Sequence, residues 1–480
     1  MTSDKTSIVS GVKWTSVSSV CTTIAKLLQI VILSRFLTKA DFGIIGIALM
    51  CINFSEIFMD LGISSGVMHV QGITKRQYSS LFWLNVFTGI VVYAVFAGLS
   101  PLIAIYYKEA ELESVLPCIF LIIIISSFYR LQRTIQFKEM RFKFIAFTEI
   151  SSNVLMLFFS VVFAFLGWGV YSLVWSTVVF YAYLAIIYLG YSLIKLKNIT
   201  FHYSNEDLKP FLKIGLFQLG NSLIDTISSE LDTIIIGRVF SLEILGVYTL
   251  CKQLSCRIYG FINPIITKVL TPALAIIQDN ISLVKQKYMQ TLYIIGIINI
   301  SIYAYIAYMS PNILSILYGS QYADYYMVLS LLCVYYSILC VGNPIGALQV
   351  ALGRTDLGFY WTLYRVASYA LALYVGCLFN DINICVLCLV LVTILNIYPS
   401  NEMLLKKMIG LRLVEYLDVY KIPTLISLAL GFVSFIHLFG WNDIINLIVA
   451  GVVFFSLYLL ILFRARPTLY QTILSIVFKR

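Results

Sequence analysis

The sequence has little charge for its length. Only 12% of its 480 residues are Asp, Glu, Lys or Arg, about half the share that is usual in a soluble globular protein. In contrast, 60% of the residues are hydrophobic, and the mean hydropathy is +0.92. A soluble fold of this size could not cover so much apolar surface, whereas a lipid bilayer can replace water around it. The composition therefore excludes a soluble globular protein and predicts a polytopic membrane protein.

Residues and motifs that carry catalysis or bind metals are also scarce. The three histidines, His69, His202 and His437, do not lie at ligand or triad spacing from a Cys or Asp. The chain lacks a phosphate-binding Gly-Lys-Ser/Thr loop, which argues against an ATP-driven pump. Cys385 and Cys388 have CxxC spacing, but no second pair or histidine accompanies them, so we interpret them as core residues rather than zinc ligands. The sequence thus predicts no metal site, no bound cofactor and no enzymatic activity.

Apolar runs long enough to cross a bilayer recur along the whole chain. A spanning helix needs about 20 mostly apolar residues, and stretches such as 81–107 and 150–194 contain no Asp, Glu, Lys or Arg. Gly167-Trp168-Gly169 divides the second stretch into two helices with a tight turn between them. The chain is therefore predicted to be all-α, with about fourteen transmembrane helices. The predicted helices are 14–35, 42–62, 80–101, 114–135, 144–166, 170–194, 211–237, 243–265, 287–309, 324–348, 358–379, 382–404, 421–439 and 443–463.

Basic residues are distributed unevenly between the predicted loops. If the N-terminus is cytoplasmic, 26 of the 33 Lys and Arg residues fall on the cytoplasmic side. Such an excess is typical of cytoplasmic loops, so the sequence predicts that both termini are cytoplasmic. Because these basic residues lie in short loops between apolar runs, we attribute the formal net charge of +10 to contact with membrane lipids. Nucleic acid is not an expected partner.

An internal repeat divides the chain. Segment 35–43 resembles segment 238–246, which lies 203 residues later, and the dipeptide 131–132 resembles 348–349. Matching segments with the same orientation predict two parallel, pseudo-symmetric six-helix lobes related by an axis along the membrane normal. The predicted parts are an N-terminal lobe over 1–197, a C-terminal lobe over 198–412, and two appended helices with a basic tail over 413–480.

Charged residues inside the predicted spans gather in the first two helices of each lobe. Such charges are unfavourable by roughly 3 kcal/mol or more and usually face a cavity or each other. Glu56 and Asp60 are four residues apart and share one helix face, and Asp225 and Asp232, seven apart, also share a face. The full set is Lys26, Glu56, Asp60, Asp225, Glu230, Asp232, Lys252 and Arg257. Two interpretations stay open: a hydrated central cavity between the lobes, or intramembrane ion pairs that touch no substrate.

Segment 130–143 is the most basic stretch, with five Lys and Arg residues and one acid. We interpret it as a cytoplasmic loop attracted to anionic lipid, and the alternative is that it gathers an anionic substrate. Glu149 follows this segment, and we expect it to pair with Lys143 or Arg141 or to enter the cavity.

Seven short motifs occur in order over nearly the whole chain. They are Ser10–Trp14, Leu33–Leu37, Asp41–Gly43, Asp60–Ile63, Leu81–Asn85, Asn263–Ala273 and Gly342–Gly346. In order and spacing they resemble the multidrug/oligosaccharidyl-lipid/polysaccharide (MOP) exporter superfamily. Within it, the likeness is greatest to the polysaccharide transport branch, which includes the colanic acid exporter and the Wzx-type flippases.

This resemblance implies a fold, a function and partners. The fold would be two lobes around a central cavity that opens alternately to each side of the bacterial inner membrane. The function would be to flip polyprenyl-diphosphate-linked oligosaccharide repeat units outward for capsule, exopolysaccharide or lipopolysaccharide O-antigen synthesis, with H⁺ or Na⁺ coupling and polymerase machinery as a partner. Lys26, Lys252 and Arg257 would then attract the diphosphate. The expected cavity acids, one or more of which would take up the coupling ion, are Asp225, Glu230, Asp232, Glu56 and Asp60.

Three other functions compete with this one. A multidrug cation antiporter of the same superfamily should have a cavity more acidic than basic, which the three basic residues within the spans disfavour. A peptidoglycan-precursor (lipid II) flippase would transport a different glycan by nearly the same physical mechanism. A membrane-embedded glycan polymerase or ligase would normally carry a large outside loop, whereas the outside loops predicted here are short.

Overall fold

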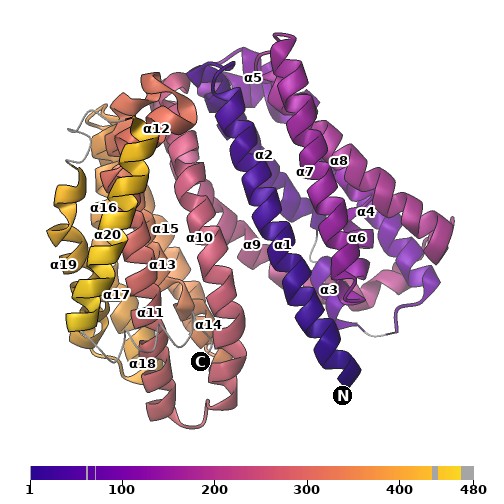
Figure 1. Ribbon diagram of the computed structural model, residues 1–480. Helices are drawn as coiled ribbons and strands as arrows, with labels where there is room; N and C mark the ends of the chain where they lie inside the picture. Colours follow the sequence, from indigo (N-terminus) through magenta and orange to yellow (C-terminus); the bar gives the residue numbers. More distant parts are fainter. Residues whose placement is uncertain (1, 61–62, 71, 435–441, 466–480) are drawn as a thin grey trace. The chain divides into compact units, whose positions relative to one another are not determined.

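The part of the chain that the structure describes is almost entirely helical. The computed structural model describes residues 2–60, 63–70, 72–434 and 442–465, and within these ranges it contains helices and turns but no β-strand (Figure 1). The helices form two compact units, Met1–Gly246 (unit 1) and Val247–Arg480 (unit 2). The all-α prediction is confirmed for these residues.

Unit 1 contains long helices joined by short turns. They are α1 (Thr2–Leu33), α2 (Lys39–Asp60), α3 (Ile63–His69), α4 (Lys75–Tyr107), α5 (Glu111–Ser127), α6 (Arg130–Lys138), α7 (Phe142–Phe165), α8 (Tyr171–Tyr191), the π-helical turn η1 (Ser192–Leu196), α9 (Asn205–Val239) and the first turn of α10 (Leu242–Ile276). The predicted tight turn at 167–169 is confirmed, because Gly167 and Gly169 adopt φ of 76° and 53° between α7 and α8. Such left-handed conformations favour glycine.

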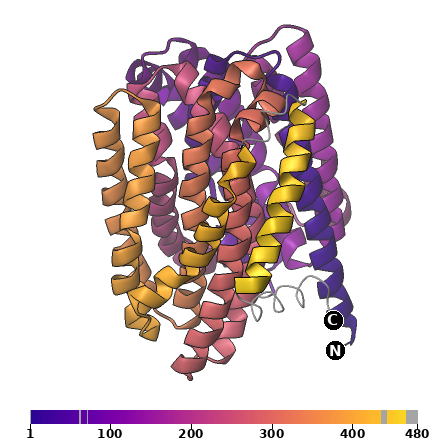
Figure 2. The ribbon, with the colours of Figure 1, turned by 60° about the vertical axis from the view of Figure 1, so that its left-hand side comes forward.

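Unit 2 continues α10 and adds a second set of helices. They are α11 (Ile281–Tyr308), α12 (Ser310–Tyr318), η2 (Ser320–Tyr325), α13 (Tyr326–Gly342), α14 (Pro344–Ala351), α15 (Thr355–Cys377), α16 (Ile382–Leu395), α17 (Ile397–Ser400), η3 (Asn401–Leu405), α18 (Lys406–Ile409), α19 (Leu413–Ala429) and α20 (Asp443–Ala465). In Figure 2, α15 and α16 run side by side as a hairpin.

Nine of the described helices are long and apolar enough to cross a membrane, and the number rises to ten if the bent pair α5 and α6 counts as one span. The chain is therefore a multi-pass membrane protein. Each of the fourteen predicted intervals overlaps a described helix, but the count of fourteen crossings remains a prediction. Residues 435–439 of the predicted span 421–439, and residues 466–480 of the predicted basic tail, lie outside the described residues.

Helix α6 is a short amphipathic helix that follows a bend of 44° after α5. On one side, Leu131 and Ile135 are each 2% exposed and pack in a core cluster with residues of α3, α4 and α9. On the other side, the Nζ of Lys138 donates hydrogen bonds to the carbonyl oxygens of Val67 and Val70 at the end of α3. A cation at a helix C-terminus is favourable, so α6 is fixed against both the core and α3.

Helix α9 packs against α2, α3 and α4 within unit 1. Its base contributes Leu208 and Phe211 to the same core cluster as α6. The predicted boundary between the N-terminal and C-terminal lobes, at 197/198, was drawn from the sequence repeat and remains a prediction. The predicted beginning of the two appended helices, at 412/413, also remains a prediction.

Helix α11 lies at the centre of unit 2, against α13, α19 and α20. One core cluster surrounds its first half, with Tyr288 and Leu292 fully buried, and another surrounds its second half together with α20. At its beginning, the Nζ of Lys285 lies 2.7 Å from Oε2 of Glu415 in α19. This contact ties α19 to α11.

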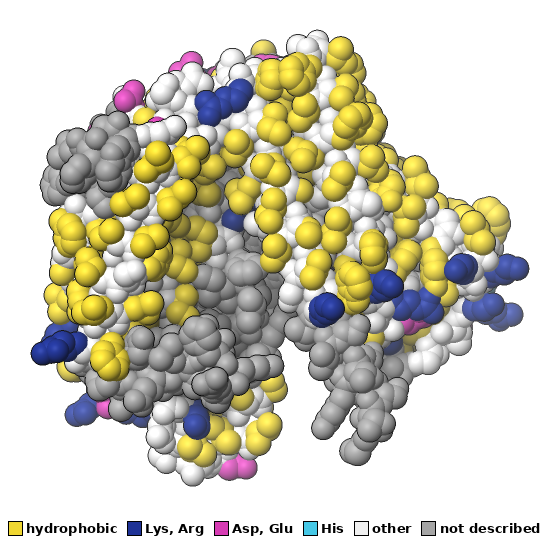
Figure 3. Space-filling view, in the orientation of Figure 1, with side chains coloured by type: hydrophobic (Ala, Val, Ile, Leu, Met, Phe, Trp, Pro, Cys, Tyr) yellow, Lys and Arg dark blue, Asp and Glu magenta, His cyan; other side chains and the backbone are white. Residues whose placement is uncertain are grey.

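The outer surface has the pattern expected of a membrane protein. Figure 3 shows hydrophobic side chains over the flanks of the helices, and most of the Lys and Arg side chains visible on that face lie in its lower half. Apolar flanks suit acyl chains, and basic residues suit the headgroup region.

Candidate functional site

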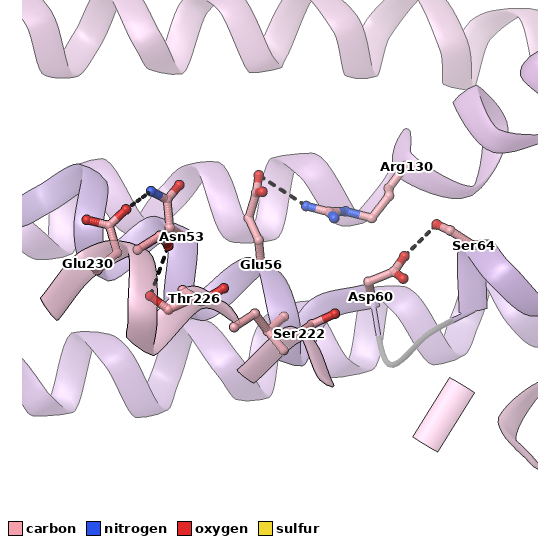
Figure 4. Close-up of a pocket in the computed structure, with 10 residues that line it drawn as sticks. Asn53, Glu56, Asp60, Ser64, Arg130, Ser222, Thr226 and Glu230 are labelled. Carbon is pink, nitrogen blue, oxygen red and sulfur yellow. Dashed lines mark hydrogen bonds and ion pairs between the residues drawn. The ribbon is translucent and has the colours of Figure 1, made fainter. Parts of the chain in front are cut away.

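Unit 1 contains a polar cavity of about 460 Å³. It lies between α2, α3, α6 and α9 (Figure 4). The lining residues are Asn53, Glu56, Ile57, Asp60, Ser64, Arg130, Ser222, Thr226, Ser229 and Glu230. Nine of these ten side chains are polar, in a chain that is 60% hydrophobic. Such a concentration of polar groups among apolar helices marks a functional site more often than a packing site.

Helical periodicity brings these side chains together. On α2, Asn53, Glu56 and Asp60 are spaced by three and four residues, so they form one stripe. On α9, the residues at 222, 226, 229 and 230 form a second stripe with the same spacing. The two polar stripes face each other across the cavity.

An ion pair crosses the cavity from α6 to α2. The Nη2 of Arg130 lies 3.4 Å from Oε1 of Glu56 (Figure 4). The Arg130 side chain is 22% exposed and the Glu56 side chain 44% exposed. Because the pair is partly open to the cavity, the Glu56 carboxylate keeps lone pairs for a ligand or water.

Hydrogen bonds fix the two ends of the cavity. At one end, Asn53 Nδ2 donates to Glu230 Oε1 over 2.8 Å and joins α2 to α9. At the other end, Ser64 Oγ donates to Asp60 Oδ1 over 2.5 Å. Figure 4 shows both contacts on opposite sides of the Glu56–Arg130 pair. Each of the three carboxylates is therefore held in place by a different neighbour.

The cavity has more negative than positive groups. Its lining includes three carboxylates, on Glu56, Asp60 and Glu230, and one guanidinium, on Arg130. An excess of carboxylates suits a proton or another cation rather than an anionic diphosphate. Within the described ranges, no three His, Cys, Asp or Glu side chains come together in a way that would hold a metal ion.

Three of the eight predicted site residues line this cavity, namely Glu56, Asp60 and Glu230. Glu56 and Asp60 share one face of α2, as predicted. Their role in ion coupling remains a prediction.

The other predicted residues lie elsewhere. In unit 1, Lys26 on α1 and Asp225 on α9 are exposed, and Asp232 on α9 is half-buried, its Oδ1 accepting a hydrogen bond from the backbone N–H of Thr233 over 2.7 Å. In unit 2, Lys252 and Arg257 are half-buried on α10. Lys26 is therefore not among the residues that line the cavity of unit 1, and the contact of the three predicted basic residues with a diphosphate remains a prediction.

Sequence reasoning missed Asn53, Arg130 and the hydroxyl residues of α9 as lining residues. The spacing of Ser222, Thr226 and Ser229 is a signal that was available, because it places three hydroxyls on one helix face. Arg130 gave no such signal, because its position depends on the bend between α5 and α6.

The basic segment 130–143 is not a simple solvated loop. Each of its five basic side chains has a partner within unit 1. The pairs are Arg130 with Glu56, Arg133 with Glu149, Lys138 with the carbonyls ending α3, Arg141 with Glu139, and Lys143 with the ring of Trp14. The expectation that Glu149 pairs with Lys143 or Arg141 is wrong, because α6 brings Arg133 to 2.6 Å from it.

Comparisons with known proteins agree with this architecture. A family model described as "Polysaccharide biosynthesis protein" matches residues 32–327. The chain is 27% identical over 427 residues to the lipopolysaccharide biosynthesis protein WzxC of Escherichia coli (strain K12), an alignment that covers 89% of this chain and 87% of WzxC. These two matches confirm the predicted resemblance to the polysaccharide branch.

Solved structures show the same fold. The structure of the lipid II flippase MurJ in an inward closed conformation superposes with a TM-score of 0.70 at 14% identity, over 98% of this chain and 100% of that chain. An inward-facing multidrug resistance MATE family transporter of the MOP superfamily superposes with a TM-score of 0.57 at 16% identity, over 85% and 95% of the two chains. At such low identity these likenesses concern the fold alone.

Proposed function

This chain belongs to the polysaccharide biosynthesis protein family, and from that membership we propose that it is an inner-membrane flippase for polyprenyl-diphosphate-linked oligosaccharide repeat units. The substrate class is supported by the family description and by the likeness to WzxC, a lipopolysaccharide biosynthesis protein. The act of transport is supported by a fold shared with a lipid II flippase and a multidrug transporter. The delivered units would serve capsule, exopolysaccharide or O-antigen synthesis, with polymerase machinery as a partner.

The proposed topology has fourteen crossings and two cytoplasmic termini. Nine or ten crossings follow from length and apolarity among the described helices. The remaining four would be α9, α10, α15 and α19, which are not among the candidates found within the described residues. Helices α9 and α10 carry charged residues that would face a hydrated interior rather than lipid, and adding these four to ten gives fourteen.

The observation that carries the proposal is the polar cavity of unit 1. A sugar-diphosphate headgroup cannot cross acyl chains without losing its hydration, so a flippase needs hydrated polar surface at membrane depth. The cavity supplies polar surface that suits the sugar hydroxyl groups, with charges held by defined partners, and its excess of carboxylates leaves the diphosphate to basic residues outside the cavity. In the proposed mechanism, access alternates between the two sides while the lipid tail stays in the bilayer, and no covalent bond is made or broken.

The division of charge suggests two different tasks. The excess of carboxylates in the unit 1 cavity suits uptake of H⁺ or Na⁺ that drives transport, with Glu56, Asp60 and Glu230 as the candidates. The diphosphate would be attracted by Lys26, Lys252 and Arg257, whose cations provide charge-assisted hydrogen bonds to phosphate. The acidic excess also suits a multidrug cation antiporter, which is the second candidate function.

Deletion of the gene in its own host separates the two candidates. A strain that lacks the flippase should accumulate lipid-linked repeat units on the cytoplasmic leaflet and lose its surface polymer, with unchanged sensitivity to cationic drugs. The wild-type gene on a plasmid should restore the polymer and serves as the control. Normal polymer with increased drug sensitivity would instead support the antiporter and reject the flippase.

A further inference from the structure

Unit 2 contains a second, separate cavity of about 570 Å³. It lies where the end of α11, the short helix α12, α13 and the beginning of α20 meet. The lining residues are Ala307, Tyr308, Ser310, Pro311, Asn312, Ser315, Ala323, Tyr326, Ser330, Ser434, Asp443 and Asn446. Asp443 is the one charged residue among them, and the set contains no Lys or Arg.

The ends of two long helices place this cavity on the side opposite the basic residues. Helix α11 is 28 residues long, carries Lys285 and Lys287 near its beginning and ends at the cavity with Tyr308, so it extends about 40 Å at 1.5 Å per residue. Helix α20 starts at the cavity with Asp443 and carries Arg464 in its last turn. Because basic helix ends are cytoplasmic by the positive-inside rule, the cavity opens on the outer side.

Four of the hydrogen-bond donors around this cavity bind acceptors within the protein. Ser310 Oγ and Ser330 Oγ donate to the carbonyl oxygen of Ala307 over 2.9 and 3.0 Å. Asn312 Nδ2 and Ser315 Oγ donate to the two carboxylate oxygens of Asp443 over 2.8 and 3.0 Å. Since a carboxylate accepts about four hydrogen bonds and a hydroxyl oxygen accepts as well as donates, Asp443 and these hydroxyl oxygens keep the capacity to accept further hydrogen bonds from a ligand.

A wall with acceptors free for a ligand favours ligands that donate hydrogen bonds. Inorganic phosphate and diphosphate are disfavoured, because the described lining residues include no Lys or Arg. A bare metal ion needs several oxygen ligands at about 2.0–2.6 Å, whereas the described lining of this 570 Å³ cavity includes a single carboxylate. Two tyrosines supply aromatic surface, and the Tyr326 side chain is 48% exposed. A neutral molecule with many hydroxyl groups fits these features.

We propose that this cavity binds a neutral, hydroxyl-rich sugar unit on the outer side of the membrane, with Asp443 as its main hydrogen-bond acceptor and Tyr326 as an aromatic wall. The chemistry of binding does not depend on transport. Its role, to hold a sugar of the delivered repeat unit away from the transport cavity, rests on the proposed function.

Saturation-transfer NMR on the full-length protein tests this proposal. The protein should be in lipid nanodiscs rather than a sugar-headed detergent, which would compete for the site. The probes are D-glucose, D-galactose, D-mannose and N-acetylglucosamine, with choline as a cationic comparison. We expect transfer to at least one sugar, and a dissociation constant about tenfold higher in Asp443→Asn, since a hydrogen bond to a charged group contributes about 1.5 kcal/mol or more.

Two further variants make the result decisive. Asp324→Asn removes an exposed acid from the neighbouring η2 without touching the lining, and it should bind like the wild type. Tyr326→Ala tests the aromatic wall at an exposed position where folding is not at risk, and should also weaken binding. No transfer to any of the four sugars, equal binding by Asp443→Asn and wild type, or preferential binding of choline would each overturn the sugar site. The gene-deletion assay would still report on the flippase independently.

Discussion

Glu230 and Asp225 are acids on the same helix, but they have different surroundings. Glu230 lines the cavity of unit 1 and accepts a hydrogen bond from Asn53 on α2 over 2.8 Å. Asp225 is exposed and does not line the cavity. From their seven-residue spacing, the sequence predicts that Asp225 and Asp232 share one face of this helix. The cavity, however, is lined by the face that carries Ser222, Thr226 and Glu230.

This difference predicts distinct effects of two conservative substitutions. Glu230→Gln keeps a carbonyl oxygen for Asn53 but removes the group that takes up a proton or cation, so ion-driven transport should fall by about tenfold or more. Asp225→Asn, the matched control, should transport within about twofold of the wild type. The measurement is flipping of a lipid-linked oligosaccharide in proteoliposomes with an imposed H⁺ or Na⁺ gradient. A fully active Glu230→Gln protein at normal expression would remove Glu230 from the coupling role.

Residue patterns predicted part of the site and not the rest, for a physical reason. Glu56 and Asp60 were recognisable because charge is rare within apolar runs and their spacing sets a common face. The partner of Glu56 was not recognisable, because Arg130 reaches it through the 44° bend between α5 and α6 and the packing of Leu131 and Ile135. Periodicity describes one helix at a time, whereas this contact depends on how two helices meet.

At the scale of elements, the sequence repeat relates the beginnings of α2 and α10, which pack closely against each other. Gly43 and Gly246 are equivalent in the 203-residue repeat, and both lie in the first turns of their helices, α2 and α10. A Cβ added at Gly43 would overlap the carbonyl oxygen of Leu242, and one added at Gly246 would overlap the carbonyl oxygen of Lys39. The sequence indicated that the two glycines are equivalent, and the structure adds that each allows the other helix to approach closely.

Gly246→Ala should therefore destabilise the protein, although alanine is the better helix former. The methyl group meets backbone rather than a movable side chain, so α2 and α10 must separate, and overpacking of this kind is unfavourable by roughly 1–3 kcal/mol. We expect the apparent Tm to fall by about 2–6 °C. Gly190→Ala in α8 is the matched control, because nothing lies within 4 Å of its added Cβ, and it should leave Tm unchanged or higher. An equal Tm for both variants would mean that the close approach at Gly246 is not required.

At the scale of the whole molecule, four of the proposed crossings, α9, α10, α15 and α19, are not among the candidate spans found within the described residues. Composition predicted a polytopic helical protein because no soluble fold could hide so much apolar surface. It could not count crossings reliably, because helices that line a hydrated interior are polar enough to resemble soluble helices. Helix α15, for example, carries Arg354 and Asp356 at its start, and α19 has only 17 residues.

Accessibility of introduced cysteines decides whether these helices cross. Each pair of sites flanks one helix, and the topology of fourteen crossings therefore assigns its two sites to opposite sides. The outer sites are Ser241→Cys, Phe379→Cys and Asn442→Cys, and the cytoplasmic sites are Glu206→Cys, Arg354→Cys and Arg412→Cys. A thiol reagent that does not cross membranes should label the outer sites on intact cells, and the cytoplasmic sites only after permeabilisation. The unsubstituted protein, with its ten native cysteines, gives the background.

The outcome at each pair bears on one helix. Labelling of Arg354→Cys and Phe379→Cys from the same side would mean that α15 does not cross, and the same result at Arg412→Cys and Asn442→Cys would exclude a crossing between them. Either result would place the beginning of α20, and with it Asp443, on a side that the positive-inside rule does not predict. If, in contrast, the two sites of every pair are labelled from opposite sides as assigned, the charged helices α9 and α10 cross the membrane. Their charges must then face water or protein within it.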